Sequence, residues 1–279
     1  MPKKQVVHIN EHSIMQETQE SREVQTYRKI DWCAIGDSFT YLNDHLDETG
    51  NRVTRGYLSR VCDALPNLNL KNRGINGSTT QNWLDVHIGK ADVYTILLGT
   101  NDWKQEIPVG EAFDFVQATP KTILGNLSRI ISNIRQVNPE ASIIVFNPVE
   151  RGDFVYINDY HNILPGSYQE LGNQHLSSVA QQIFTCVQGE KIYTVDLHTL
   201  CGFTQDNVIK FKRVRTKDGY ADVAFPDYIG IPFNPELDEY PYPIESIALT
   251  YDGLHPSDEG SKIIANIVAE AMTKVLTLR

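Results

Sequence analysis

The 279-residue sequence predicts an α/β protein, built as a three-layer α/β/α sandwich around a parallel sheet. From Asp31 onward, short runs rich in Val, Ile and Tyr alternate with segments whose apolar residues recur every three or four positions. Strands that alternate with helices pair in parallel and place the helices on both faces of the sheet. The expected core is therefore one sheet with five strands.

The five predicted strands are short runs with β-branched and aromatic residues, which is the composition of buried parallel strands. In chain order they are Trp32–Gly36, Leu68–Asn72, Val93–Leu98, Ser142–Asn147 and Lys191–Leu197.

Two helices are predicted from periodic apolar stripes. In Thr122–Val137 the apolar residues form one stripe, and Pro139 stops the helix soon afterwards. The last segment has the same spacing from Ile263 to Val275, and Ser257 before it is a suitable N-cap.

The chain divides into an N-terminal part and one domain. Residues 1–29 are polar without a clear period and are expected to be an extension or accessory element, followed by the domain over residues 30–279. Within the domain, residues 201–247 have no helical period and contain many aromatic residues and prolines. A long irregular insertion of this kind is usually functional or disordered, and the aromatic residues favour order.

Composition limits the classes of partner. Hydrophobic residues make up 41% and charged residues 22% of the chain, which permits a sizeable core. The formal net charge of −10, without a basic stripe, argues against nucleic acid and anionic membranes as partners. No apolar stretch approaches the ~18 residues of a membrane span. The sequence as printed predicts a soluble cytoplasmic protein, or a secreted or periplasmic one if a signal peptide has been removed; it does not indicate the oligomeric state.

Polar and glycine-rich segments follow three of the predicted strands. Gly36-Asp37-Ser38-Phe39 follows the first, Asn72-Arg73-Gly74-Ile75-Asn76-Gly77 the second, and Gly99-Thr100-Asn101-Asp102 the third. Because the carboxyl ends of parallel strands meet at one edge, where open α/β folds bind ligands, these segments should lie together. For each of them a structural role is the common alternative: a helix cap for Ser38, a turn for the glycines and for Asn101.

A fourth segment, Asp252-Gly253-Leu254-His255-Pro256, precedes the last helix. An Asp three residues before a His can hold the Nδ1 of its ring and leave Nε2 free to take a proton from a nucleophile. Asp196 and His198 form the second-ranked pair of this kind.

The four segments in this order resemble the SGNH hydrolase family, also called GDSL esterases and lipases. The resemblance implies the flavodoxin-like strand order 2-1-3-4-5. It also implies a serine ester hydrolase without cofactor or metal, in which Ser38 forms an acyl-enzyme, His255 acts as base and acid, and Asp252 orients His255. The implied oxyanion hole consists of the backbone N–H groups of Ser38 and Gly77 and the side chain of Asn101.

The substrate is expected to be an acyl ester of a small molecule or oligosaccharide, with acetyl on carbohydrate favoured. The candidate substrate-binding residues are Phe39, Trp103, Tyr240, Tyr242 and Tyr251, and the insertion is expected to form one wall of the cleft. An acyltransferase using the same site and a non-catalytic glycan-binding module of the same fold are the alternatives.

Motifs of other enzyme classes are absent from the sequence or lie in an unsuitable segment. The sequence has no Gly-x-Ser-x-Gly elbow, no Walker A motif and no Gly-x-Gly-x-x-Gly that opens a helix after a strand. His8-Ile9-Asn10-Glu11-His12 matches a zinc-protease pattern, but it lies in a polar segment without a helical stripe, so no metal site is expected. The four cysteines have no metal-ligand spacing and are expected to be reduced and mostly buried.

Overall fold

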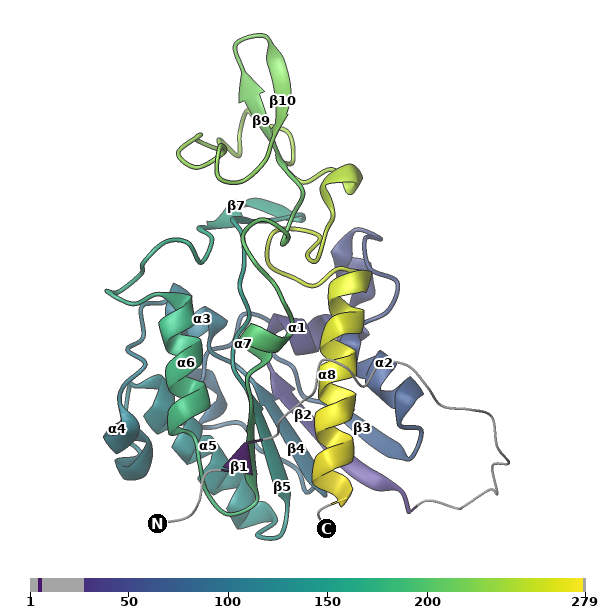
Figure 1. Cartoon of the computed structure of the whole chain (residues 1–279), viewed down its shortest axis with the longest axis vertical. Coiled ribbons are helices and arrows are strands. Elements are labelled where there is room, and N and C mark those ends of the chain that lie inside the picture. Colours follow the sequence, from purple (N-terminus) through teal and green to yellow (C-terminus); the bar gives the residue numbers. More distant parts are fainter. Residues whose placement is uncertain (1–4, 7–27, 278–279) are drawn as a thin grey trace.

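The computed structural model describes residues 5–6 and 28–277 (Figure 1). All five predicted strands are present in one parallel sheet: β2 (Ile30–Gly36), β3 (Leu68–Asn72), β4 (Val93–Leu97), β5 (Ser142–Phe146) and β8 (Ile192–Val195). They are arranged in the order β3-β2-β4-β5-β8, so the predicted flavodoxin-like order is confirmed.

A sixth strand, β1 (Gln5–Val6), pairs in parallel with β8 at the edge of this sheet. It lies within the segment that the sequence analysis treats as an extension. The sequence does not predict this strand, because two residues in a polar segment carry no periodic signal. The pattern His8–His12 lies outside the described residues.

The helices follow the strands as the alternation predicts. In chain order the α-helices are α1 (Ser38–Tyr41), α2 (Tyr57–Ala64), α3 (Thr100–Lys104), α4 (Ala112–Gln117), α5 (Ile123–Val137), α6 (Leu176–Cys186), α7 (Leu197–Leu200) and α8 (Asp258–Thr277). Short 3-10 helices are η1 (Leu42–Asp44), η2 (Leu46–Thr49), η3 (Gln81–Trp83) and η4 (Ile244–Ser246).

The ends of both predicted helices are explained by local chemistry. Thr122 caps α5, since its hydroxyl accepts the N–H of Gly125 at 3.0 Å. Ser257 caps α8 as predicted, with its Oγ accepting the N–H of Gly260 at 3.2 Å. Helix α5 ends at Val137, shortly before the predicted breaker.

Two apolar clusters, one on each face of the sheet, make the three layers. Alternate residues of a strand point to opposite faces. Trp32 and Ala34 of β2 join the cluster that includes α2 and α8, whereas Cys33 and Ile35 join the cluster that includes α5 and α6. Figure 1 shows the same division, with α2 and α8 on one side of the sheet and α4, α5 and α6 on the other.

Two antiparallel hairpins extend the domain at the end opposite to the C-terminal end of α8 (Figure 1). The first pairs β6 (Phe154–Tyr156) with β7 (Asp159–Leu164), and the second pairs β9 (Lys212–Thr216) with β10 (Gly219–Val223). The insertion at 201–247, expected to be irregular, therefore contains a regular hairpin. The sequence does not predict either hairpin, because charged and polar residues interrupt the period-2 pattern of the strands, as in Lys-Arg-Val-Arg-Thr.

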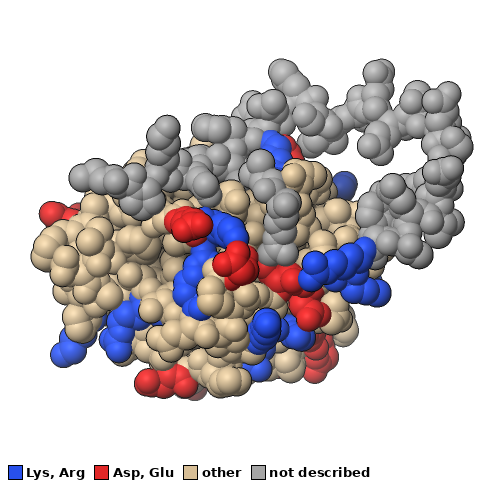
Figure 2. All heavy atoms as spheres, turned by 90° about the horizontal axis from the view of Figure 1, so that it is seen from below, with Lys and Arg blue, Asp and Glu red and all other residues tan. Residues whose placement is uncertain are grey.

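In the described part of the face seen from below, basic and acidic side chains are interspersed (Figure 2). None of the helices within residues 28–277 is long and apolar enough to cross a membrane. The four cysteines are free; Cys33, Cys186 and Cys201 are buried and Cys62 is half-buried.

Candidate active site

Ser38 is the first residue of α1, directly after the carboxyl end of β2. Asp37 caps this short helix, because its Oδ1 accepts the N–H of Phe39 at 3.0 Å. Gly36 is required before it, since a Cβ at this position would lie 2.0 Å from the hydroxyl oxygen of Thr40. The sharp strand-to-helix turn therefore depends on small and capping residues, and it places the Ser38 hydroxyl at the edge of the sheet.

His255 lies next to Ser38 although 217 residues separate them in the sequence. The Nε2 atom of His255 is 2.8 Å from the Oγ of Ser38. On the other side of the ring, Nδ1 is 2.6 Å from the Oδ2 of Asp252. The three side chains form one hydrogen-bonded chain with the geometry of a nucleophile, a base and a residue that orients the base.

The loop that carries this pair is shaped by glycine. Gly253 has a φ of +89°, and a Cβ on it would lie 1.8 Å from the carbonyl oxygen of Asp153. Only glycine fits this close approach in this backbone conformation. The loop is further fixed by the N–H of Gly253, which donates to the hydroxyl of Thr250 at 3.1 Å.

The predicted oxyanion residues have compatible surroundings. Asn101 is on α3 and buried, and its Nδ2 donates to the carbonyl of Ser78 at 3.0 Å. An amide carries two N–H donors, so one anchors the side chain and the second can serve a ligand. Gly77 has a φ of +69°, and no described atom lies within 4 Å of the position that a Cβ would take. A side chain at position 77 would thus enter the open space that a substrate needs.

Buried carboxyls support the same edge of the sheet. Burial raises the pKa of Asp37 to about 7 and that of Asp102 to about 6. Asp102 accepts the N–H of Thr80 at 3.0 Å and also its hydroxyl. Asp102 therefore ties α3, which contains Asn101, to the loop that contains Gly77, and this fixes the two predicted donors relative to each other.

Aromatic rings surround the side chain of His255. Phe154 stands edge-on to the His255 ring at 5.3 Å between centroids, while Phe39 and Tyr251 each lie at 5.9 Å. Ser38 is only 3% exposed and His255 only 4%. The hydroxyl and the ring that are hydrogen-bonded to each other are therefore almost closed off from solvent.

The three remaining predicted substrate-binding aromatics differ in burial. Trp103 and Tyr242 are fully buried, and each donates its polar hydrogen to a backbone carbonyl. Tyr240 is half-buried and donates to the carbonyl of Val155 at 3.0 Å. Of these three residues, only Tyr240 is partly exposed.

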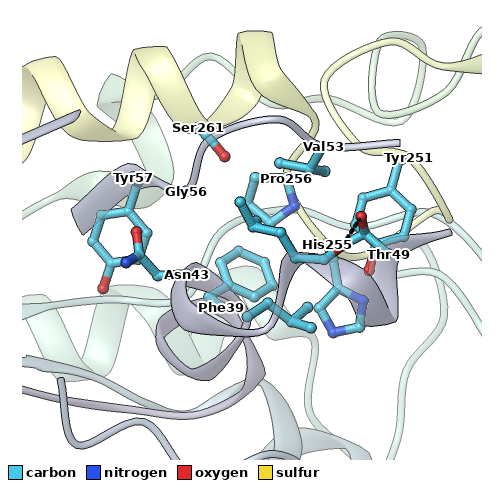
Figure 3. Close-up of a pocket in the computed structure, with 12 residues that line it drawn as sticks. Phe39, Asn43, Thr49, Val53, Gly56, Tyr57, Tyr251, His255, Pro256 and Ser261 are labelled. Atoms are coloured by element: carbon cyan, nitrogen blue, oxygen red, sulfur yellow. Dashed lines mark hydrogen bonds between the residues drawn. The ribbon is translucent and has the colours of Figure 1, made fainter. Parts of the chain in front are cut away.

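A small cavity and an open groove flank the histidine. The cavity has a volume of about 20 Å³ and lies between α1, η2, α2 and the His255 loop (Figure 3). It has room for about one water molecule. Figure 3 shows Val53, Tyr251 and His255 at one end of it and Asn43 and Tyr57 at the other, with Phe39 between them.

The groove has a volume of about 270 Å³ and lies between the β6–β7 hairpin and the insertion. Phe154 belongs to its wall and also packs against His255, so the groove adjoins the catalytic centre. Its lining includes Asp153, Phe154, Tyr168, Gln169, Lys212 and Phe233.

The second-ranked pair does not form. Asp196 instead caps α7 and accepts the side-chain amide of Asn147 at 2.8 Å. His198 has its Nε2 at 3.3 Å from Glu150, and its Nδ1 at 2.9 Å from the carbonyl of Pro148. Among the residues that the structure describes, no group of three His, Cys, Asp or Glu side chains could hold a metal ion.

Sequence reasoning missed Arg151 and Phe154, both on the segment after β5. Arg151 is fully buried, and Phe154 touches the catalytic ring. A signal was available, because Glu150-Arg151 is a charged pair just beyond the carboxyl end of a buried strand.

Comparisons with known proteins fit this geometry. The model of the GDSL-like lipase/acylhydrolase family matches residues 34–263, a range that contains Ser38, Gly77, Asn101, Asp252 and His255. A solved structure from Chitinophaga pinensis DSM 2588, described as a possible lipase, is 46% identical with a TM-score of 0.85, over 90% of this chain and all of that one.

More distant structures share the fold. A Lactobacillus plantarum protein is 17% identical with a TM-score of 0.55, over 89% of this chain and 98% of that one. The lipase Lip_vut3 from a goat rumen metagenome is 15% identical with a TM-score of 0.50, over 87% of this chain and 97% of that one. No curated protein matches the sequence.

Proposed function

Because this chain belongs to the GDSL-like lipase/acylhydrolase family and is an SGNH-type ester hydrolase, we propose that it cleaves its substrate through an acyl-enzyme formed on Ser38. The observation that carries the proposal is the hydrogen-bonded chain from Ser38 through His255 to Asp252, with heavy-atom distances of 2.8 and 2.6 Å. A serine hydroxyl is a weak nucleophile until an adjacent base removes its proton.

In the first step the Ser38 Oγ attacks the ester carbonyl while Nε2 of His255 takes its proton. Asp252 stabilises the imidazolium that forms and holds the ring in the required tautomer. His255 then returns the proton to the leaving alcohol. Water attacks the acyl-enzyme in the second step, with His255 again as base, and releases the acid.

The negative charge of each tetrahedral intermediate falls on the former carbonyl oxygen. The proposed donors are the backbone N–H groups of Ser38 and Gly77 and the free N–H of Asn101. Donors fixed before the reaction stabilise this charge without reorganisation, which is usually the largest electrostatic contribution to such a rate. The bond from Asn101 to the Ser78 carbonyl and the open space at Gly77 support this assignment.

The substrate is proposed to be a small acyl group, such as acetyl, on a carbohydrate. The close packing around Ser38 supports a small acyl group. The groove supports a polar alcohol, because it offers an aromatic ring, Phe233, together with hydrogen-bonding groups such as Gln169 and Lys212.

Active-site trapping tests the mechanism. A fluorophosphonate should label the wild-type protein at Ser38, identified by peptide mass, and should not label Ser38→Ala. Ser178→Ala, an exposed serine on α6, is the matched control and should be labelled like the wild type. Labelling of Ser38→Ala at the same rate would refute the nucleophile.

A substrate panel tests the acyl and alcohol preferences. We expect the highest kcat/KM on p-nitrophenyl acetate within a series up to the palmitate, and release of acetate from acetylated oligosaccharides. A maximum at long chains would contradict the proposed small acyl group.

A further inference from the structure

Arg151 is a fully buried cation beside the catalytic centre that the proposed mechanism does not use. It follows β5 and packs between two aromatic rings. The guanidinium carbon is 5.9 Å from the Trp103 ring and 6.0 Å from the Phe154 ring. Burial lowers the pKa of Arg151 to about 10, so the side chain is still protonated at neutral pH.

The two rings connect Arg151 to both halves of the proposed machinery. Trp103 is two residues after Asn101 on α3, and Phe154 touches the His255 ring. The backbone makes a further link, because the N–H of Gly152 donates to the carbonyl of Gly253 in the catalytic loop at 2.8 Å. Arg151 thus contacts one ring from the helix that carries Asn101 and one ring that packs against His255.

The guanidinium has no hydrogen-bond partner among the described residues. All three of its nitrogens, Nε, Nη1 and Nη2, are buried and unpaired. A buried donor without a hydrogen-bond partner destabilises the fold by roughly 1–3 kcal/mol, and by more when the group is charged. A fold that retains five such N–H donors in its interior is expected to satisfy them with a ligand.

The neighbouring carboxylates balance the charge of Arg151 without taking its donors. Asp252 attracts it most strongly, followed by Asp153. Asp252 accepts hydrogen bonds from the N–H groups of Leu254 and His255 and from the His255 ring. The donors of Arg151 thus stay available while its charge is stabilised.

Asp153 also accepts its hydrogen bonds from groups other than Arg151. It accepts from Lys212 at 3.1 Å, from the hydroxyl of Tyr168 at 2.7 Å and from the N–H of Gly166 at 2.9 Å. Both carboxylates thus use their oxygens on other donors, and neither forms a hydrogen bond with the Arg151 guanidinium.

We propose that Arg151 binds a carboxylate carried by the ester substrate, which makes the enzyme selective for anionic esters. A carboxylate is the planar two-oxygen acceptor that matches the guanidinium fork. The inference rests on the proposed function, since it assigns a substrate class to the same site. The carboxylate can belong to the alcohol, as in an acylated sugar acid, or to the acyl group, as in a half-ester.

One aromatic ring, Phe154, is a neighbour of both Arg151 and the partner of Ser38. Arg151 and Ser38 are buried, and Phe154 packs against the guanidinium and against His255. Phe154 begins the β6–β7 hairpin and also lines the adjoining groove. The proposal therefore requires Phe154 to move when a substrate enters from the groove.

Two pairs of esters with and without a carboxylate test the proposal and separate its two sources. The alcohol-side pair is 4-acetoxybenzoate and its methyl ester, and the acyl-side pair is monoethyl glutarate and diethyl glutarate. For the wild type we expect kcat/KM to favour the carboxylate in one pair by at least tenfold, and that pair identifies the side. No preference in either pair would overturn the proposal.

The variants assign the preference to Arg151. In Arg151→Met the ratio of the two kcat/KM values should fall at least tenfold, and in Arg151→Lys, which keeps the charge but loses the fork, it should fall less. Arg129→Met, an exposed arginine on α5, is the control for the change in net charge and should keep the wild-type ratio. Equal losses on both members of a pair would mean that Arg151 only supports the fold or Asp252, and the proposal would be wrong.

A binding measurement separates this inference from the esterase mechanism and does not require Arg151→Met to fold. Calorimetry on Ser38→Ala should show one of two preferences of at least tenfold: 4-hydroxybenzoate binds more tightly than methyl 4-hydroxybenzoate, or monoethyl glutarate binds more tightly than diethyl glutarate. Ester cleavage that survives in Ser38→Ala refutes the proposed function alone. Equal binding of acid and ester refutes the role of Arg151 alone.

Discussion

Asp252 holds His255 at two points. Its Oδ1 accepts the backbone N–H of His255 at 2.7 Å, and its Oδ2 lies 2.6 Å from Nδ1 of the ring. One carboxylate therefore fixes both the position of the residue and the orientation of the imidazole. Because Asp252 is fully buried, water cannot replace either bond.

The first prediction follows from this double contact. Asp252→Asn keeps the shape but puts an N–H donor or a weaker acceptor opposite Nδ1, which favours the wrong tautomer. We expect kcat on p-nitrophenyl acetate to fall by about 10⁴-fold with intact folding. Asp63→Asn, which removes an exposed carboxylate paired with Arg55, is the control and should retain activity. A loss below tenfold in Asp252→Asn would show that His255 does not need this carboxylate.

The second prediction concerns the oxyanion hole. Asn101→Ala removes a donor that acts mainly on the transition state, so kcat should fall by about 100- to 1,000-fold with little change in KM. Asn69→Ala on β3, whose amide donates to Asp31 at the surface, is the matched control. A rise in KM with unchanged kcat would place Asn101 in ground-state binding instead.

The third prediction is a pH dependence of stability. Burial raises the pKa of Asp37 from 3.8 to about 7, so the folded state holds a proton that the unfolded state releases between these values. The stability contribution of Asp37 is fully present below the unfolded pKa and is lost as the pH rises through the folded pKa. Asp37→Asn keeps the Oδ1 cap on Phe39 without titrating.

The measurement compares urea unfolding of wild type and Asp37→Asn at pH 5 and pH 8. Between pH 5 and pH 8, the free energy of unfolding of Asp37→Asn should rise relative to that of the wild type by on the order of 2 kcal/mol. Asp31→Asn, a half-exposed carboxylate on β2, supplies the comparison. A constant difference across this range would mean that Asp37 is ionised in the folded protein at both values.

The fourth prediction tests the insertion as a wall of the cleft. Phe233 lines the groove beside Phe154, whereas Phe113 on α4 is 67% exposed and distant in the fold. Phe233→Ala should lower kcat/KM on acetylated oligosaccharides severalfold more than on p-nitrophenyl acetate, because the larger alcohol uses the groove. Phe113→Ala should leave the ratio of the two substrates unchanged. Equal ratios in both variants would exclude this part of the insertion from specificity.

The sequence by itself determined the sheet and the residues at its edge. Alternating runs such as Val93–Leu97 and Ile123–Val137 identify strand and helix because burial on two faces or on one stripe leaves different periods. Ser38, Asn101 and His255 are candidates from the sequence because each closely follows a predicted strand or precedes the last helix, and parallel topology brings these places together.

The tertiary structure decided everything that depends on contacts between distant segments. The partner of His198 is Glu150 rather than Asp196, which is nearer in the sequence, because Asp196 is the N-cap of α7. Trp103 and Tyr242 are buried supports, which composition cannot distinguish from exposed rings. The unpaired guanidinium of Arg151 depends on which neighbours surround it and which of their acceptors are already occupied. The period of the apolar residues indicates which face of an element is buried, but not which polar groups meet there. Only the folded chain therefore shows Arg151 beside His255.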